Sequence, residues 1–294
     1  MSERILILGA TGMLGHKLTQ RLAREFPTSA TLRAPAAPGS PAARAALGEA
    51  RLLLDWDARR PGAIERALGW AEPTVVVNAV GVIKQIEEAK DPIAQIELNA
   101  LLPHRIVRAC RALGGAIRVI HFSTDCVFSG RAGPYAEGGP PDPEDVYGRS
   151  KLLGEIEGPN SLTLRSSVVG RELRGRSSLV EWFLRQRGKR VKGFARALYS
   201  GLTTNAMAEL VADFVKRWPE FEGIWHVAAE PISKFELLKM IDRHYALGIE
   251  IEQDEAFSCD RRLDGRALSA RTGFEAPGWE RMIAEMRADP TPYD

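Results

Sequence analysis

The sequence predicts an α/β protein with a doubly wound parallel sheet and a smaller C-terminal lobe. Short apolar runs alternate with segments of helical apolar spacing, which is the pattern of parallel strands joined by helices. A glycine-rich turn, Gly9-Ala10-Thr11-Gly12-Met13-Leu14-Gly15, joins the first strand to the first helix. A chain of 294 residues is also long enough to bury a large core.

The elements of the first part follow in order. Residues 4–8 form an apolar run typical of a buried parallel strand, and the spacing of Leu18, Leu22 and Phe26 predicts a helix over residues 16–26. Similar apolar runs predict strands at residues 30–32, 51–54, 74–78, 118–122 and 162–165. Helices are expected at residues 61–71, around Tyr147, and at residues 93–113, where Pro103 should kink or break the helix.

The pattern changes beyond Val169. Helices are predicted at residues 179–187, 204–218, 233–245 and 279–286, and strands at residues 191–199 and 223–227. We expect the strand at residues 223–227 to rejoin the main sheet. The predicted organisation is therefore a first domain over residues 1–169, with 204–227 packing back onto it, and a C-terminal lobe made mainly of residues 170–294.

The glycine-rich turn predicts a dinucleotide site. A tight turn is the simpler interpretation of such a motif, but strand, glycine turn and helix in succession let the backbone approach a pyrophosphate at the positive end of the first helix. The residues assigned to this cofactor site are Gly9, Thr11, Gly12, Met13, Leu14 and Gly15.

Residues at the ends of the next strands extend this site. Arg33 stands where an acidic residue would bind an unphosphorylated ribose, so a basic residue there favours NADP over NAD, although an ordinary surface arginine is the alternative. Asp55 and Trp56 could flank the adenine, and Trp56 is nearly as well explained as core. The small segment that closes the fourth strand would let the backbone lie close to the cofactor; it consists of Asn78, Ala79 and Val80.

Tyr147 and Lys151 predict the chemistry. Residues four apart share one helical face, so the Lys151 ammonium could lie beside the Tyr147 phenol, lower its pKa and reach a cofactor ribose. A phenol tuned in this way can exchange a proton with an alcohol or ketone. Thr124, with Ser123 as the alternate, would hydrogen-bond the same substrate oxygen. Asn99 is expected to hold a water linked to Lys151.

Composition excludes several other classes. The formal charge of +2 indicates neither nucleic acid nor an anionic membrane as partner. The three cysteines, Cys110, Cys126 and Cys259, lack metal-ligand spacing, so no metal site is expected. The sequence shows neither a signal peptide nor an apolar run of about 20 residues, so a cytoplasmic protein is the expectation.

At these residues the chain resembles an extended short-chain dehydrogenase/reductase of the dTDP-4-dehydrorhamnose reductase family. The segment Ser123-Thr124-Asp125-Cys126-Val127-Phe128-Ser129-Gly130 resembles the family's Ser-Thr-Asp-Tyr-Val-Phe-x-Gly, and Tyr147 to Glu155 its Tyr-Gly-x-Thr-Lys-x-x-Gly-Glu. Leu164-Arg165-Ser166-Ser167 is similar to its Leu-Arg-Thr-Ser. The resemblance implies a Rossmann domain for NADP(H), with NAD possible, and a lobe that closes over a nucleotide-sugar whose 4-keto group is reduced. Thr124, Tyr147 and Lys151 would be catalytic.

Two departures from the family affect the substrate site. Cys126 replaces a tyrosine and Val168 replaces a tryptophan, so the sugar pocket should have a different shape. Lys84 and Tyr199 are assigned to the substrate site as well. Cys126 after Asp125 also argues against a nucleotide-sugar 4,6-dehydratase, which uses Asp-Glu there. An epimerase with retained cofactor and a regulatory subunit, like the β subunit of methionine adenosyltransferase, stay open as alternatives, and a homodimer is possible.

Overall fold

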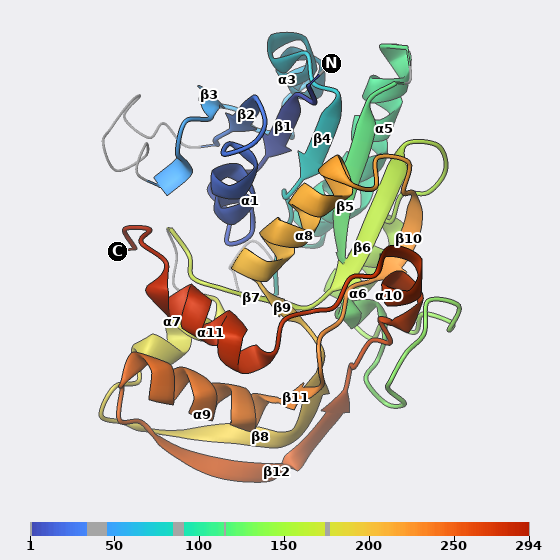
Figure 1. Cartoon of the computed structure of the whole chain (residues 1–294). Helices are drawn as coiled ribbons and strands as arrows, with labels where there is room; N and C mark the ends of the chain where they lie inside the picture. The colour runs from blue at the N-terminus through green and yellow to red at the C-terminus, as the bar shows by residue number, and fades with distance from the viewer. Residues whose placement is uncertain (1, 34–45, 85–90, 115, 174–176, 294) are drawn as a thin grey trace.

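The protein is built on one seven-stranded parallel sheet, with strand order β10-β6-β5-β4-β1-β2-β3 (Figure 1). The structure is a computed structural model that describes residues 2–33, 46–84, 91–114, 116–173 and 177–293. All strand pairs in this sheet are parallel. The strands are β1 (Ile5–Leu8), β2 (Thr28–Thr31), β3 (Arg51–Leu53), β4 (Val75–Asn78), β5 (Arg118–Thr124), β6 (Ser161–Ser166) and β10 (Gly223–His226).

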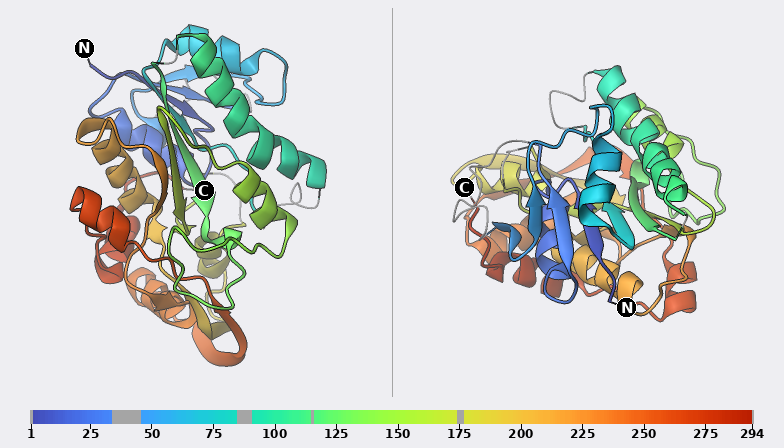
Figure 2. Two further views of the ribbon diagram at one scale, coloured as in Figure 1. Left: turned by 90° about the vertical axis from the view of Figure 1, so that its right-hand side faces the viewer. Right: turned by 90° about the horizontal axis from the view of Figure 1, so that it is seen from above.

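Helices cover both faces of this sheet, as the two further views show (Figure 2). Helices α1 (Gly15–Leu22) and α8 (Thr204–Lys216) share one buried core with Val77 and Ile120. Helices α3 (Ala63–Ala71) and α5 (Leu102–Ala112) share a second core with Val76 and Val119. Because the strands alternate their side chains between two apolar cores, both faces of the sheet are buried. The predicted fold class is confirmed.

The long helix expected at residues 93–113 is three segments. It consists of α4 (Pro92–Gln95), a π-helical segment η2 (Ile96–Leu101) and α5. Pro103 has no backbone N–H to donate to the carbonyl of Asn99 four residues earlier, which gives a physical reason for the irregular turn just before it. The following helix α6 (Val146–Leu153) approaches this turn so closely that a Cβ on Gly154 would lie 1.8 Å from the Asn99 carbonyl oxygen.

The C-terminal part adds a three-stranded sheet below the main sheet in Figure 1, with order β11-β8-β12. Helix α9 packs on strands β8 and β12 of this sheet. A short parallel pair, β7 with β9, lies where the chain crosses between the two sheets. The elements are β7 (Val168–Val169), α7 (Leu179–Leu184), β8 (Arg190–Tyr199), β9 (Leu202–Thr203), β11 (Ile232–Ser233), α9 (Lys234–Tyr245), β12 (Glu250–Asp260), α10 (Arg266–Thr272) and α11 (Trp279–Ala288).

Strand β12 was not predicted from the sequence. It pairs in parallel with β8, and the register shifts between Asp254 and Ser258. Most of its side chains are exposed or half-buried, so it lacks the apolar alternation that reveals a strand.

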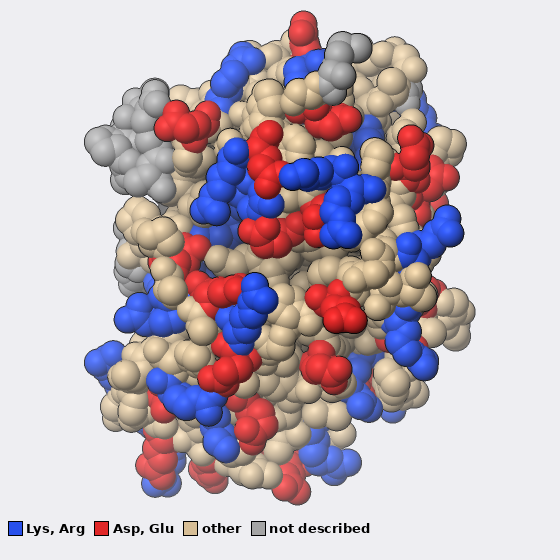
Figure 3. Space-filling view, in the orientation of Figure 1, with Lys and Arg blue, Asp and Glu red and all other residues tan. Residues whose placement is uncertain are grey.

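The described surface mixes charges of both signs. On the face seen in Figure 3, Lys and Arg side chains are interspersed with Asp and Glu. Within the described residues, none of the helices has the length and apolar character needed to cross a membrane.

Candidate active site

The glycine-rich turn forms a tight cradle between β1 and α1. Gly9 adopts a φ of +87°, which L side chains rarely adopt, and a Cβ on Gly15 would lie 2.1 Å from the Gly9 carbonyl oxygen. The turn is also fixed to β2, because Thr31 accepts hydrogen bonds from Gly9 N through its hydroxyl and from Ala10 N through its carbonyl, at 3.1 and 3.0 Å. Because the glycines of this turn carry no side chains, the backbone there fits the close approach of a dinucleotide pyrophosphate.

A cavity of about 190 Å³ opens over this cradle. Seven of the residues assigned to the cofactor line it. Its lining includes Gly9, Thr11, Gly12, Arg33, Trp56, Ala79 and Val80. Gly15 is buried beneath the turn, Leu14 packs against the core, and Met13 is half-buried before α1. The carboxyl ends of β1, β2 and β4 thus meet at one site, as expected for a parallel sheet.

Strand β3 places its polar residues differently from the prediction. Asp55, expected at the adenine, is an exposed carboxylate that pairs with Arg60 at 2.9 Å. Asp57 and Arg59 line the cavity instead and bind each other at 2.7 Å. Trp56 is 3% exposed, lines the cavity with one edge and donates its indole N–H to the Ala63 carbonyl at 2.7 Å.

A buried polar row crosses the sheet between the cradle and helix α6. The Asn78 amide lies 3.2 Å from His121 Nδ1, and Lys151 Nζ lies 3.5 Å from His121 Nε2. Burial and the neighbouring Lys151 charge hold the pKa of His121 well below its ordinary value, so His121 is neutral near pH 7. A neutral imidazole has a single acceptor nitrogen, so His121 accepts from either the Asn78 amide or the Lys151 ammonium, according to its tautomer.

Lys151 points at the strand. Its ammonium donates to the Phe122 carbonyl at 2.5 Å, and burial lowers its pKa to about 8 while Glu155 acts in the opposite direction. The lowering of the Tyr147 pKa that was expected from Lys151 does not prevail in this structure. Burial, followed by the nearby Cys126, raises the pKa of the phenol, and hydrogen bonding by the Thr124 hydroxyl opposes the rise.

Thr124, at the end of β5, is brought together with Tyr147. Besides the phenol, its hydroxyl contacts Asp125 at 3.1 Å and accepts the Cys126 backbone N–H at 3.1 Å. Two adjacent hydroxyls, one of them a protonated phenol, can hydrogen-bond a single carbonyl oxygen and deliver a proton to it.

Ser123 is turned away from this pair. Its hydroxyl donates to Glu155 at 2.6 Å, and Glu155 forms a buried ion pair with Arg165 at 2.7 Å. Because successive side chains of a strand point to opposite faces, Thr124 and Ser123 cannot both face Tyr147. The structure therefore favours Thr124 over the alternate Ser123 as the hydroxyl beside the phenol.

Asn99 braces the site and does not contact Lys151 in the described structure. Its side chain accepts the Val82 N–H at 2.9 Å, donates to the Val82 carbonyl at 3.0 Å and donates to the Ser150 hydroxyl at 3.2 Å. It thereby fixes the loop after β4 against helix α6. These bonds are direct, and the water link to Lys151 stays a prediction.

Two of the residues assigned to the substrate, Lys84 and Cys126, lie near Tyr147. Lys84 Nζ lies 5.4 Å from the centroid of the Tyr147 ring and pairs with Asp145 at 2.5 Å. Asp145 also caps helix α6, because its other carboxylate oxygen accepts the Gly148 N–H at 2.8 Å. Burial, together with the nearby Asp125 charge, raises the pKa of Cys126 to about 11.

The other two substrate residues come from strands of the C-terminal part. Val168 lies in β7, half-buried against the core, and Tyr199 ends β8 with 2% of its surface exposed. Three further residues of this region were missed from the sequence. An aspartate directly before a helix is a recognisable N-cap, so Asp145 could have been found. Lys234 and Arg261 carry no local signal and reach the site only through the fold.

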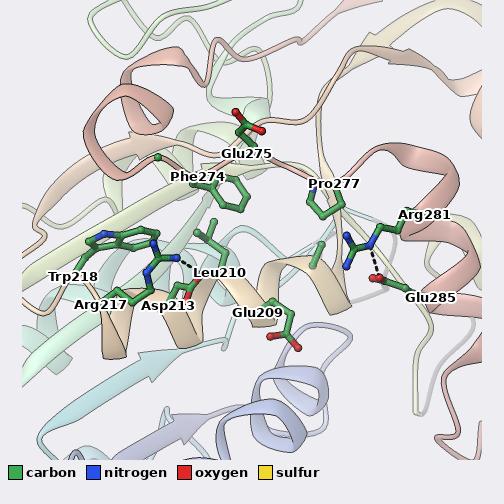
Figure 4. A pocket seen from close by; sticks show the side chains of 12 residues that line it. Glu209, Leu210, Asp213, Arg217, Trp218, Phe274, Glu275, Pro277, Arg281 and Glu285 are labelled. Atoms are coloured by element: carbon green, nitrogen blue, oxygen red, sulfur yellow. Dashed lines mark hydrogen bonds and ion pairs between the residues drawn. The ribbon is translucent and has the colours of Figure 1, made fainter.

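A larger cavity of about 490 Å³ lies elsewhere, between α8 and the segment from Gly273 to Glu285 (Figure 4). Four of its charged side chains form two pairs, Arg217 with Asp213 at 3.4 Å and Arg281 with Glu285 at 2.7 Å. Among the described residues, three or more His, Cys, Asp or Glu side chains nowhere form a cluster suited to a metal ion.

Comparison with known proteins identifies a family and its relatives. The family described as RmlD substrate binding domain matches residues 3–290. The dTDP-4-dehydrorhamnose reductase of Streptomyces griseus is 35% identical over 153 residues, which are 52% of this chain and 43% of that protein, so the chain matches less than half the length of this relative.

Two solved structures share the fold. The dTDP-4-dehydrorhamnose reductase of Bacillus anthracis, in complex with NADP, has a TM-score of 0.78 at 18% identity and covers 97% of this chain and 99% of that one. The UDP-glucose 4-epimerase of Thermus thermophilus, in complex with NAD, has a TM-score of 0.77 at 21% identity and covers 97% of each chain. The match over nearly the whole length shows that the chain belongs to the RmlD substrate binding domain family, among the proteins similar to dTDP-4-dehydrorhamnose reductase.

Proposed function

We propose that the protein is an NADPH-dependent reductase of a 4-keto deoxy-sugar nucleotide. The observation that carries this proposal is the meeting of Thr124 and Tyr147 at the carboxyl end of β5, on the same sheet edge as the glycine cradle. The activities named for the relative in Streptomyces griseus and the structure from Bacillus anthracis support it.

Each residue of the site would have its own role in this reaction. A bound NADPH supplies a hydride to the carbonyl carbon. Thr124 holds the carbonyl oxygen, and Tyr147 gives its phenolic proton to the alkoxide that forms. Tyr147 is suited to this role because its raised pKa keeps it protonated near pH 7. The Lys151 ammonium, anchored on Phe122, adds positive charge next to the reacting groups below about pH 8.

The cofactor preference rests on the cavity at the ends of β2 and β3. Arg33 and Arg59 both line this cavity, and Asp57 beside them pairs with Arg59, so the three side chains together keep an excess of positive charge. Two guanidinium groups at the adenosine end suit a 2′-phosphate, so we propose NADPH as the preferred cofactor, with NADH as a weaker one.

We further propose that residues 1–169 with 204–227 form the cofactor-binding unit, and that the rest of residues 170–294 form the substrate-binding unit. The pairing of β10 with β6 supports this division.

All three cysteines are free, which suits a reducing cytoplasm. A homodimer is the proposed assembly, and light scattering would test it.

The test is a panel of 4-keto sugar nucleotides offered with NADPH and with NADH, followed by the loss of cofactor absorbance. We expect oxidation of NADPH with at least one of the dTDP-linked substrates, and slower oxidation of NADH. Tightly bound oxidised cofactor in the purified protein, with interconversion of epimers, would replace the proposal by an epimerase. NADPH binding without any turnover, together with a changed activity of a partner enzyme, would replace it by a regulatory subunit.

A further inference from the structure

The half-buried ammonium of Lys234 lies on the C-terminal side of the site. It is the first residue of α9, and its Nζ lies 3.8 Å from the centroid of the Tyr199 ring. Among the described residues, no carboxylate forms an ion pair with it and no acceptor forms a hydrogen bond. A half-buried ammonium that has only an aromatic face as its neighbour is costly to keep charged.

Arg261 adds a second cation at the same place. It follows β12, and its guanidinium donates to the carbonyls of Phe128 and Ser129 at 3.1 and 3.4 Å and to the Cys126 thiol at 3.6 Å. All three acceptors are neutral, so among the described residues the Arg261 charge has no bound carboxylate.

Lys234 and Arg261 face one region beside the catalytic loop. Burial lowers the pKa of Lys234, and of the charges that act on it Asp125 and Cys126 raise this pKa and Arg261 lowers it. Asp125 and Cys126 also act on Arg261. The geometry agrees, because the backbone N–H of Arg261 donates at 3.0 Å to the carbonyl of Leu198, the residue before Tyr199. Asp125, 7% exposed, and Asp145 are the nearby acids. Asp145 is already paired with Lys84, and the single carboxylate of Asp125 cannot neutralise two cations.

The hydroxyl of Tyr199 is a second, independent indication that a ligand binds here. Its hydroxyl is buried without a hydrogen-bond partner among the described residues, and its ring carries the Lys234 ammonium on one face. Buried hydroxyls normally find a partner. A ligand atom bound beside Lys234 would lie next to this ring.

We propose that Lys234 and Arg261 form an anion subsite that holds the diphosphate of the substrate. This inference rests on the proposed nucleotide-sugar reductase function. Two cations without carboxylate partners would gain most from a doubly charged ligand, which removes the cost of their burial. Lys84, the other cation assigned to the substrate, is already paired with Asp145 at 2.5 Å.

The first test uses inorganic pyrophosphate as the probe, with the full chain and saturating NADPH so that the cofactor's own phosphate positions are filled. We expect pyrophosphate to raise the unfolding temperature of the unmodified protein, and its Kd to rise at least tenfold in Lys234→Gln. The matched control is Lys239→Gln on the exposed side of the same helix, where the lysine side chain is 53% exposed. Equal Kd values in all three proteins would overturn the subsite.

A second variant separates binding from a structural role. Lys234→Met removes the charge and keeps an apolar chain over Tyr199, so the unfolding temperature should stay level or rise while pyrophosphate binding is lost. A marked fall in unfolding temperature with pyrophosphate binding retained would show that Lys234 only supports the fold.

Kinetics separates this inference from the proposed function. In Lys234→Gln we expect KM for the sugar nucleotide to rise at least tenfold, with kcat within threefold and NADPH affinity unchanged. An unchanged KM would overturn the subsite while the reductase stands. Pyrophosphate binding that depends on Lys234, in a protein that reduces no 4-keto sugar, would overturn the reductase while the anion subsite stands.

Discussion

Tyr147 carries the most direct prediction at the scale of single residues. Tyr147→Phe removes the proton donor and keeps the ring, so kcat should fall at least about a hundredfold, within the usual contribution of general acid catalysis. NADPH affinity, measured by fluorescence titration, should stay within about twofold, because the phenol acts on the substrate. Tyr245→Phe is the control, since the Tyr245 hydroxyl is buried but lies in α9. A fully active Tyr147→Phe would end the assignment.

Lys151 predicts a pH dependence of stability. Burial lowers its pKa from 10.5 to about 8, so between these values the unfolded chain binds more protons at this residue than the folded chain. Its contribution to the free energy of unfolding should therefore rise by roughly 3 kcal/mol from pH 8 to pH 10.5. Denaturant titrations of the unmodified protein and Lys151→Met, compared at each pH, measure this change. A constant difference between the two proteins would mean that the Lys151 ammonium is not held at a lowered pKa.

The sequence motifs predicted which residues form much of the site. They did not predict the hydrogen bonds that these residues make. The glycine turn, Thr124 and Tyr147 stand where the motifs placed them, at the carboxyl edge of the sheet. The hydrogen-bond acceptors of Lys151 and Asn99 could not be predicted because helical spacing gives only the face of a residue. Their actual acceptors, Phe122 and Val82, lie on other segments, and backbone carbonyls carry no sequence signal.

At the scale of elements, the contact between α6 and η2 predicts an intolerant glycine. Gly154→Ala would place its Cβ 1.8 Å from the Asn99 carbonyl oxygen, so α6 must move and the free energy of unfolding should fall by about 2–3 kcal/mol or more. Because α6 carries Tyr147 and Lys151, kcat should fall as well.

Gly69→Ala in α3 is the matched control for this substitution. Nothing lies within 4 Å of a Cβ at Gly69, so the change should stabilise the protein by about 0.5–1 kcal/mol through helix propensity. Denaturant unfolding measures both variants. Equal effects at the two positions would contradict the close approach of α6 to the π-helical turn.

The sequence located most elements and missed those whose pattern depends on tertiary contacts. Pro103 signalled an irregularity, yet a π-helical turn over Ile96–Leu101 reflects the docking of α6 as well as the missing N–H. Strand β12 escaped prediction because only its partner β8 and helix α9 make it a strand. Its own residues are largely polar.

At the scale of the whole molecule, a buried ion pair joins the two ends of the described chain. Lys17 in α1 lies 2.5 Å from Asp289 after α11, with side-chain exposures of 3% and 11%. Burial would raise the pKa of Asp289, but its hydrogen bonds with Lys17 and Thr291 outweigh this and lower the pKa to about 2. Residues 272 positions apart give no local signal, so this contact could not be predicted from the sequence.

Asp289→Asn should therefore cost stability. It leaves Lys17 buried without its counter-charge, and the free energy of unfolding should fall by about 3–5 kcal/mol. Glu285→Gln, which breaks the Arg281 pair at a carboxylate that is 44% exposed, should change it by less than about 1 kcal/mol. Thermal and denaturant unfolding compare the two variants, and similar small losses in both would contradict a buried pair.

The packing of the C-terminal residues near α1 also determines where an affinity tag can be attached. Tyr293 lies with its ring 4.4 Å from the Arg171 guanidinium and 5.8 Å from the His16 ring, and His16 follows the glycine turn. Extra sequence fused after residue 293 would crowd the entrance to the first helix and disturb cofactor loading. A fusion placed ahead of β1 emerges at the opposite rim of the sheet, which makes the amino end the better position for purification handles (Figure 1).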